Sequence, residues 1–339
     1  MQPQKIKLKF TRMGFLREWD LEDGSVTSIG ACDDWMELDF TEAQIRVFEV
    51  CESCKAPDPG TSANKASKEE VTVLDGSWNF LTKELNVLKL DEWVYKIRNW
   101  HAMEKEGVTG TPGQVNSYTA IFEVEEIPDG EIRLVLDDLK QWIPSHVGFL
   151  CRKRSLEIYL NDKKVEAFKP SCWQEKQYLE AKINEMIRKG KNKISIHTIS
   201  LLNPMHSLVE PVYLLGDFVL LGGKIFRNNG KISGYWSDNG FPYYSGVGVY
   251  MKEFVLDEDP EVFKGMVLEL DGVKDGCAVR INGQDVCVRY WPPFTVNILQ
   301  YATRGLNLME IEVFNTLENL YGRNILQSGL VGAKIIKLR

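Results

Sequence analysis

Short stretches in which apolar and polar residues alternate recur along almost the whole chain. In the first, Ile6, Leu8 and Phe10 alternate with three lysines. Because successive side chains of a β-strand point to opposite faces, a period of two predicts a half-buried strand. Similar stretches follow at spacings of roughly 8–12 residues, with turn-forming residues between them. The pattern predicts an all-β protein.

The same succession of stretches occurs twice. The first copy has alternating stretches at residues 118–125, 133–139, 156–165 and 193–198, and the second has them at 250–256, 267–273, 277–286 and 309–315. Each copy contains a turn of residue types that tolerate a positive φ, Asn161-Asp162 in one and Asn282-Gly283 in the other. A short helical turn and a Gly-x-Asn corner precede the last strand of each copy. We therefore expect tandem jelly-roll β-sandwiches.

A polar segment separates this repeat from the N-terminal strands. Residues 57–70 are rich in Pro, Gly and Ser and have no apolar period, which is typical of a linker. We expect an N-terminal β-strand segment at 1–56, the end of a preceding β-domain, before this linker. The two sandwiches are then expected at 71–220 and 221–339.

Charge and cysteine content narrow the function classes. Lysine and arginine number 41 against 48 aspartates and glutamates, a formal net charge of −7, which disfavours nucleic acid and polybasic membrane-surface partners. No stretch approaches the roughly 20 apolar residues of a membrane span, and the start lacks the apolar core of a signal peptide. Seven scattered cysteines predict reduced thiols and a bacterial cytoplasmic location. A chain that opens directly in a strand is also compatible with a truncated start.

Five short motifs, taken in order, resemble the C-terminal region of large bacterial glycoside hydrolases. They are residues 210–218 (EPVYLLGDF), 241–246 (FPYYSG), the turn 282–283 (NG), 291–294 (WPPF) and 328–332 (SGLVG). The resemblance covers about residues 71–339 and is similar to α-L-rhamnosidases of glycoside hydrolase family 106 and to the family 2 sugar-binding domain. It implies jelly rolls of the galactose-binding-domain type beside a catalytic barrel. No βα repeat for such a barrel occurs in this sequence, so the resemblance implies a non-catalytic region whose partners are carbohydrate and the catalytic domain of the same or a longer polypeptide.

Two groups of residues have the chemistry for sugar binding. The apolar C–H faces of a sugar ring lie on aromatic rings, while its hydroxyls pair with amides, carboxylates or arginine. The first group comprises Trp100, His101, Trp142 and His146, and the second comprises Trp236, Tyr243, Tyr244, Arg289 and Trp291. For both groups the alternative is structural, because aromatic side chains also plug the ends of sandwiches and pack between repeats.

Catalytic and metal sites have weaker support. Asp257 and Asp259 supply the hard oxygen ligands that calcium prefers, but their spacing matches no calcium motif, and we expect no other cofactor. The pair Asp137-Asp138 is expected in a turn or at a strand end, where acids are usually solvated, and we expect no catalytic residue. The leading prediction is a non-catalytic carbohydrate-binding accessory region of a glycoside hydrolase acting on plant or bacterial glycans, with rhamnose-containing glycans as candidates. The alternatives are a purely structural scaffold that packs on a missing catalytic domain, and a free-standing glycosidase with an unrecognised carboxylate pair.

Overall fold

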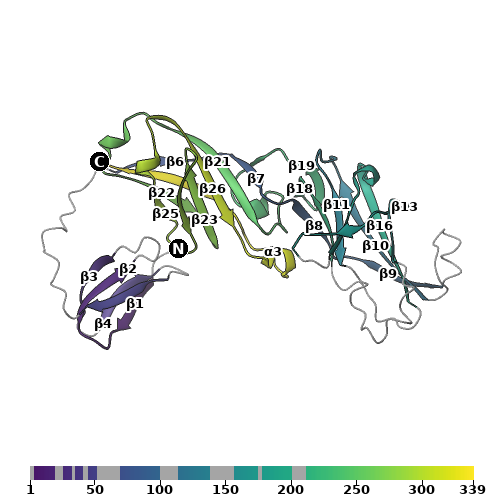
Figure 1. Ribbon diagram of the computed structural model, residues 1–339, viewed down its shortest axis with the longest axis horizontal. Helices are drawn as coiled ribbons and strands as arrows, with labels where there is room; N and C mark the ends of the chain where they lie inside the picture. The colour runs from purple at the N-terminus through teal and green to yellow at the C-terminus, as the bar shows by residue number, and fades with distance from the viewer. Residues whose placement is uncertain are drawn as a thin grey trace. The chain divides into compact units, whose positions relative to one another are not determined.

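The computed structural model is an all-β protein, which confirms the predicted fold class (Figure 1). It describes residues 4–19, 26–32, 35–40, 45–51, 69–99, 114–137, 156–174, 178–200 and 211–339. Contacts divide the chain into two compact units. Unit 1 consists of residues 1–79, 248–315 and 328–339, and unit 2 consists of residues 80–247 and 316–327.

The N-terminal strands build two small antiparallel sheets. β1 (Gln4–Lys9) pairs with β4 (Trp35–Phe40), and β2 (Gly14–Trp19) lies between β3 (Val26–Cys32) and β5 (Val47–Cys51). The alternation at residues 5–10 therefore does form a strand. Leu16 and Cys32 are completely buried between these strands.

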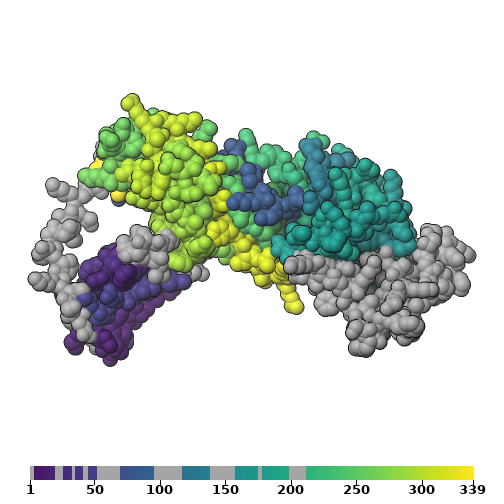
Figure 2. Space-filling model, in the orientation of Figure 1, coloured from purple at the N-terminus to yellow at the C-terminus, as the bar shows by residue number. Residues whose placement is uncertain are grey.

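Unit 2 is a sandwich of two sheets, and Figure 2 shows much of its surface in teal. Its larger sheet contains β9 (Val94–Asn99), β10 (Gln114–Val124), β12 (Leu156–Leu160), β13 (Lys163–Lys164), β16 (Gly190–Ser200), β18 (Phe218–Leu221) and β19 (Lys224–Arg227). Its smaller sheet has the order β14 (Lys169–Pro170), β15 (Tyr178–Lys182), β11 (Arg133–Asp137), β17 (Val212–Gly216) and β8 (Asn86–Leu90). The short strand β20 (Lys231–Ile232) follows in the chain.

The middle of the smaller sheet of unit 2 is buried on both faces. Leu134 and Leu214 face the main core, whereas the neighbouring Val135 and Tyr213 belong to a second apolar cluster on the other face. This second cluster also contains Leu320, from the short helix α3 (Glu318–Tyr321). All of β17 is consequently buried, which explains why its sequence is continuously apolar rather than alternating.

Unit 1 contains the other sandwich. One sheet has the order β25 (Thr295–Asn297), β22 (Gly265–Asp271), β27 (Gly332–Leu338) and β6 (Glu69–Val73). The other places β21 (Val247–Leu256), β26 (Gly305–Phe314), β23 (Gly276–Ile281) and β24 (Gln284–Arg289) side by side. The inward side chains of these strands are fully buried, with Met266, Leu268 and Ile311 at 0% exposure.

A corner built from two asparagines occurs in both sandwiches. In unit 2, Asn161 Nδ2 donates to Asn192 Oδ1 at 2.7 Å, and Asn192 Nδ2 donates to the carbonyl of Arg188 at 2.7 Å. In unit 1, Asn282 Nδ2 donates to Asn307 Oδ1 at 2.8 Å, and Asn307 Nδ2 donates to a carbonyl four residues earlier at 2.7 Å. Asn161 and Asn282 both have a φ of 52°, as the predicted hairpin turns require. The repeat seen in the sequence is therefore real at the level of individual hydrogen bonds.

The two units are not continuous along the chain, which differs from the expected sandwiches at 71–220 and 221–339. β6 pairs with β27 in the register Val71↔Ile336, so residues 69–73 complete the sheet that the last strand closes. β7 (Trp78–Thr82) runs across the boundary between residues 79 and 80. Its Trp78 packs edge-on against Tyr250, with ring centroids 6.2 Å apart. The local pattern of apolar and polar residues cannot predict that β6 pairs with β27, because the two strands lie at opposite ends of the repeat.

The cysteines differ from the expectation of uniformly reduced thiols. Cys32, Cys172, Cys277 and Cys287 are in the thiol form, but Cys51 is disulfide-bonded. Within the described ranges, no helix has the length and apolarity to cross a membrane.

Candidate functional site

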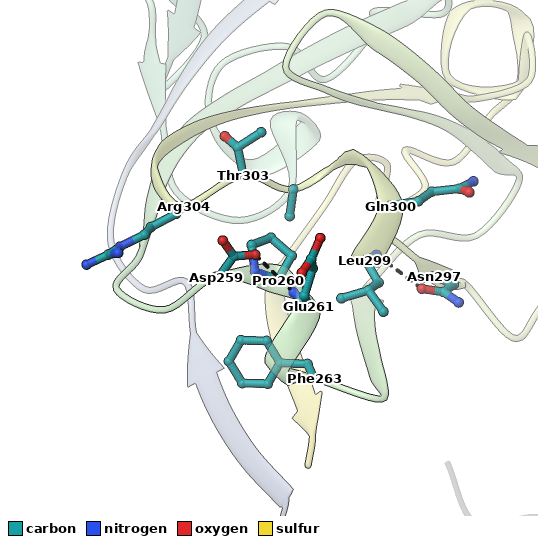
Figure 3. A pocket seen from close by; sticks show the side chains of 10 residues that line it. Asp259, Pro260, Glu261, Phe263, Asn297, Leu299, Gln300, Thr303 and Arg304 are labelled. Carbon is teal, nitrogen blue, oxygen red and sulfur yellow. Dashed lines mark hydrogen bonds between the residues drawn. The ribbon is translucent and has the colours of Figure 1, made fainter.

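An open pocket lies at one end of the unit 1 sandwich, with a volume of about 740 Å³ (Figure 3). Such a volume is within the range of small-molecule sites in proteins. It is formed by the 3-10 turn η4 (Pro260–Val262), the end of β25 and the 3-10 turn η5 (Leu299–Tyr301). The polar side chains that line it are those of Asp259, Glu261, Asn297, Gln300, Thr303 and Arg304.

Local hydrogen bonds hold the two walls of this pocket. Asp259 precedes η4, and its Oδ1 accepts from the backbone N–H of Glu261 at 3.2 Å. Asn297 does the same for η5, since its Oδ1 accepts from the backbone N–H of Leu299 at 3.1 Å. These are typical Asx turns, in which a short polar side chain fixes the backbone two residues on. The walls are therefore fixed by the residues that also line the pocket.

The aromatic residue of the pocket is braced from behind. Phe263 is 5% exposed, and the Arg339 guanidinium lies 5.0 Å from its ring centroid. Arg339 is also hydrogen-bonded to Glu258, and this bond lowers the pKa of that carboxyl. Phe263 thus supports the pocket without offering a broad ring face to a ligand.

The pocket has the chemistry for hydroxyl groups. Figure 3 shows the Asp259 and Glu261 carboxylates between Arg304 on one side and Leu299 on the other. The amides of Asn297 and Gln300 can each donate and accept, the carboxylates accept, and the guanidinium donates in a planar fork. Such a mixture matches vicinal hydroxyls, each of which is both a donor and an acceptor.

The two repeats differ at one position beside the pocket. Ile183 and Ile298 occupy equivalent places in the two repeats, because they donate to the carbonyls of Ile132 and Met266 at 3.0 and 2.9 Å. The next residue is Asn184 in unit 2 and Leu299 in unit 1. Asn184 bridges the facing loop, with its Nδ2 donating to the Gly130 carbonyl at 2.8 Å. Leucine can make no such bridge, and in unit 1 the space beside it stays open.

Two residues of the second predicted group are core residues. Trp236 and Tyr244 are 0% and 1% exposed, so in this structure neither ring presents a face to solvent. Trp236 packs on Phe80 and Tyr244, with ring centroids 6.2 and 5.9 Å apart. Tyr244 donates its hydroxyl to Glu84 Oε2 at 2.6 Å, and burial together with this bond raises the pKa of Tyr244.

The other members of the second group lie at two further places. Tyr243 is half-buried between the two apolar clusters of unit 2, and burial raises its pKa. Arg289 and Trp291 are half-buried in unit 1, at the end of β24 and just after it. Tyr290 between them is 60% exposed, and its ring lies 6.2 Å from that of Trp291. Trp291 and its exposed neighbour Tyr290 thus form an aromatic pair that solvent reaches.

The first predicted group lies outside the described residues. It comprises Trp100, His101, Trp142 and His146. Sugar binding by these four residues therefore remains a prediction.

The acidic residues have structural surroundings. Asp257 is exposed, and Asp259 uses one oxygen to cap η4. Among the described residues, no group of three or more potential ligands could hold a metal ion, so calcium at Asp257 and Asp259 gains no support. Asp137 lies at the end of β11, one of the two expected places, but it is 3% exposed rather than solvated.

Most of the polar lining of the unit 1 pocket could not be recognised in the sequence. Asn297, Gln300 and Arg304 are single polar residues in a segment that otherwise marks only the repeat, and Asp259 was a candidate for calcium alone. One clue was present, because Asn297 and Asp259 each stand two residues before a turn residue whose N–H they accept. The two segments come together because β22 pairs with β25 in one sheet, and no local feature of the sequence indicates that pairing.

No protein-family model and no curated protein sequence matches the chain. Among solved structures, it is similar to a rhamnosidase from Novosphingobium sp. PP1Y, with 14% identity and a TM-score of 0.28 over 77% of this chain and 25% of that one. It is similar to an α-L-rhamnosidase from Streptomyces avermitilis, with 10% identity and a TM-score of 0.30 over 99% of this chain and 36% of that one. A putative β-galactosidase from Bacteroides fragilis has 11% identity and a TM-score of 0.22 over 73% and 36%. The chain thus spans well under half the length of these glycoside hydrolases.

Proposed function

We propose that this chain is a carbohydrate-binding accessory region of a glycoside hydrolase, and that the unit 1 pocket holds a sugar. The observation that carries the proposal is the lining of that pocket, where two amides, two carboxylates and a guanidinium surround a space of about 740 Å³. Sugar hydroxyls need this mixture of planar donors and acceptors. The motifs of the sequence resemblance make rhamnose-containing glycans the first ligands to try.

The test uses the full chain and a matched pair of glutamine variants. Gln300→Ala removes an amide from the pocket, while Gln284→Ala removes an exposed amide at the start of β24. Binding of rhamnose-containing and galactose-containing oligosaccharides is measured by saturation-transfer NMR and then by titration. We expect Gln300→Ala to weaken binding about tenfold, in proportion to a lost hydrogen bond, and Gln284→Ala to leave it unchanged.

Two results would contradict the proposal. One is the absence of saturation transfer to any oligosaccharide at millimolar concentration. The other is binding that is equally insensitive to both glutamine variants. Trp236→Ala is not a suitable probe, because it removes a fully buried ring and would report on folding.

A structural scaffold is the second candidate, and the exposed face of β26 favours it. Leu306 and Leu308 are 61% and 41% exposed on the same face of this strand, whereas the intervening Asn307 is buried. Adjacent exposed leucines are typical of a surface that another domain covers. Concentration-dependent self-association of the chain, reduced in a Leu308→Asp variant, would support this candidate, and a monomer at all concentrations would contradict it.

A further inference from the structure

A smaller hollow of about 360 Å³ lies in unit 2, on the face of the smaller sheet opposite the main core. Its lining combines one aromatic ring with charged groups of both signs. The side chains are those of Trp173, Glu84, Arg133, Lys169, Glu180 and Cys172, with Leu85, Pro170 and Leu215 between them. None of the predicted site residues is among these, and the unit 1 pocket shares no residue with them.

The indole of Trp173 is held in a fixed orientation. Its ring packs against Tyr213 and Tyr178, with centroids 5.0 and 5.7 Å apart. Its backbone N–H donates to Ser171 Oγ at 3.1 Å, which anchors the turn that carries it. A half-buried ring fixed on one side and open to a hollow on the other can stack on the C–H face of a sugar ring without losing side-chain freedom on binding.

Beside this ring lies a buried carboxylate with three partners. Glu180 Oε2 accepts from Ser171 Oγ at 2.8 Å and lies 3.7 Å from Arg133, while Oε1 lies 3.2 Å from Lys169 Nζ. Burial alone would raise the pKa of Glu180, but these bonds outweigh it and the pKa is lowered. Glu180 therefore stays ionised and fixes both cations at the rim of the hollow.

Lys169 and Glu84 have hydrogen-bonding groups that a ligand can use. Lys169 has three donors and contacts Glu180 with its ammonium group, and its side chain is 70% exposed. Glu84 accepts from Tyr244 through Oε2, which leaves its other oxygen for a ligand hydroxyl. The hollow is lined by two negative and two positive side chains, whose charges sum to zero. A charged ligand would therefore lie beside a side chain of the same sign, which favours an uncharged ligand.

We propose that this hollow of unit 2 is a second carbohydrate site, which binds one uncharged sugar unit stacked on Trp173 and hydrogen-bonded to Lys169, Arg133 and Glu84. The proposal extends the proposed function, but it is carried by other residues. It would make the chain a two-site binder, and two weak sites on one polypeptide raise the overall affinity for a glycan that reaches both.

The test isolates this hollow by using the full chain with the Gln300→Ala and Arg304→Ala changes, which disable the unit 1 pocket. The probes are methyl rhamnopyranoside and methyl galactopyranoside as neutral sugars, and sodium methyl galacturonide as an anionic one. We expect the neutral glycosides to bind in this background. Lys169→Ala should weaken that binding about tenfold, and Lys163→Ala, which removes an exposed lysine of β13, should not change it.

Three outcomes would overturn the proposal. They are no binding of either neutral glycoside in this background, tighter binding of the galacturonide than of both neutral probes, and equal effects of Lys169→Ala and Lys163→Ala. Because Lys169 is mostly exposed, its variant tests binding even if Trp173→Ala fails to fold. Failure of the proposed function can be distinguished from failure of this proposal. It would appear as a Gln300→Ala single variant that binds oligosaccharides as tightly as the parent.

Discussion

The corners of the two sandwiches match bond for bond, yet their surroundings differ. In unit 2 the loop that faces the corner is bridged by Asn184, whose Oδ1 accepts from Ile132 N–H at 2.9 Å and whose Nδ2 donates to the Gly130 carbonyl. In unit 1 the equivalent residue is Leu299, and a pocket lies beside it. Buried amides hold the same corner in both copies, whereas the flanking residue bridges the facing loop in unit 2 and lines a pocket in unit 1.

The largest effect is expected from removing the shared corner. Asn192 and Asn307 are both 0% exposed, and each donates to two backbone carbonyls. Because several buried groups lose their partners together, Asn192→Ala and Asn307→Ala should each lower the free energy of unfolding by about 3 kcal/mol or more. Urea denaturation followed by fluorescence measures this. Asn229→Ala, which removes one exposed side-chain bond, is the control, and equal losses in all three variants would show that the corner has no special weight.

Exchanging Asn184 and Leu299 should remove the loop bridge from unit 2 and add one in unit 1. Asn184→Leu leaves the Ile132 N–H and the Gly130 carbonyl without this partner and should cost about 1–3 kcal/mol. Leu299→Asn should add a bridge in unit 1, partly fill the pocket and weaken sugar binding about tenfold at nearly unchanged stability. Thermal unfolding and ligand titration of the two variants check both statements. If the Leu299→Asn protein binds sugar as tightly as the parent, the residue at position 299 does not control binding in the pocket.

The repeats should also differ in their response to acid. Glu180 on β15 has its counterpart at Thr295 on β25, since Ala181 pairs with Leu134 as Val296 pairs with Leu268. The pKa of Glu180 is lowered in the folded protein, so its contribution to stability is present above the ordinary glutamate pKa of about 4.3 and is lost as pH falls through the lowered value. The stability difference between the parent and Glu180→Gln should therefore be constant above about pH 5 and should shrink as the pH falls below about 4.3 towards the lowered pKa.

Denaturation of both proteins across that pH range measures the difference. Thr295→Val in unit 1 is the matched control and should show no such pH dependence. A parent-minus-Glu180→Gln difference that is constant with pH would mean that the carboxylate is not held ionised by Ser171 and its cationic neighbours.

The smallest effect is expected for the ion pairs behind the pocket. Hydrogen bonds from Lys337 and Arg339 lower the pKa of Glu70, and a bond from Arg339 lowers that of Glu258, but Arg339 and both carboxylates lie at the surface. Exposed pairs are screened by salt. Arg339→Ala should therefore change the unfolding midpoint slightly in low salt, and the change should vanish in about 1 M NaCl. A salt-independent loss would indicate that Arg339 acts through its contact with Phe263 instead.

Local chemistry made much of the fold predictable. The turns at Asn161 and Asn282 follow from the residue types that accept a positive φ, and the strands around them follow from a period of two. Trp236 was not predictable, because in an irregular segment no period shows which way a ring points. The pocket was not predictable either, since Asp259 and Arg304 meet only through the pairing of distant strands.

The discontinuity of the units has a consequence for how such a protein can be divided. The chain passes between the units at residues 79–80, 247–248, 315–316 and 327–328. No single cut releases either sandwich whole, and a truncation after residue 220 would leave β6 without β27. Each sandwich has its own core, but neither can be expressed whole by truncating the chain at one point.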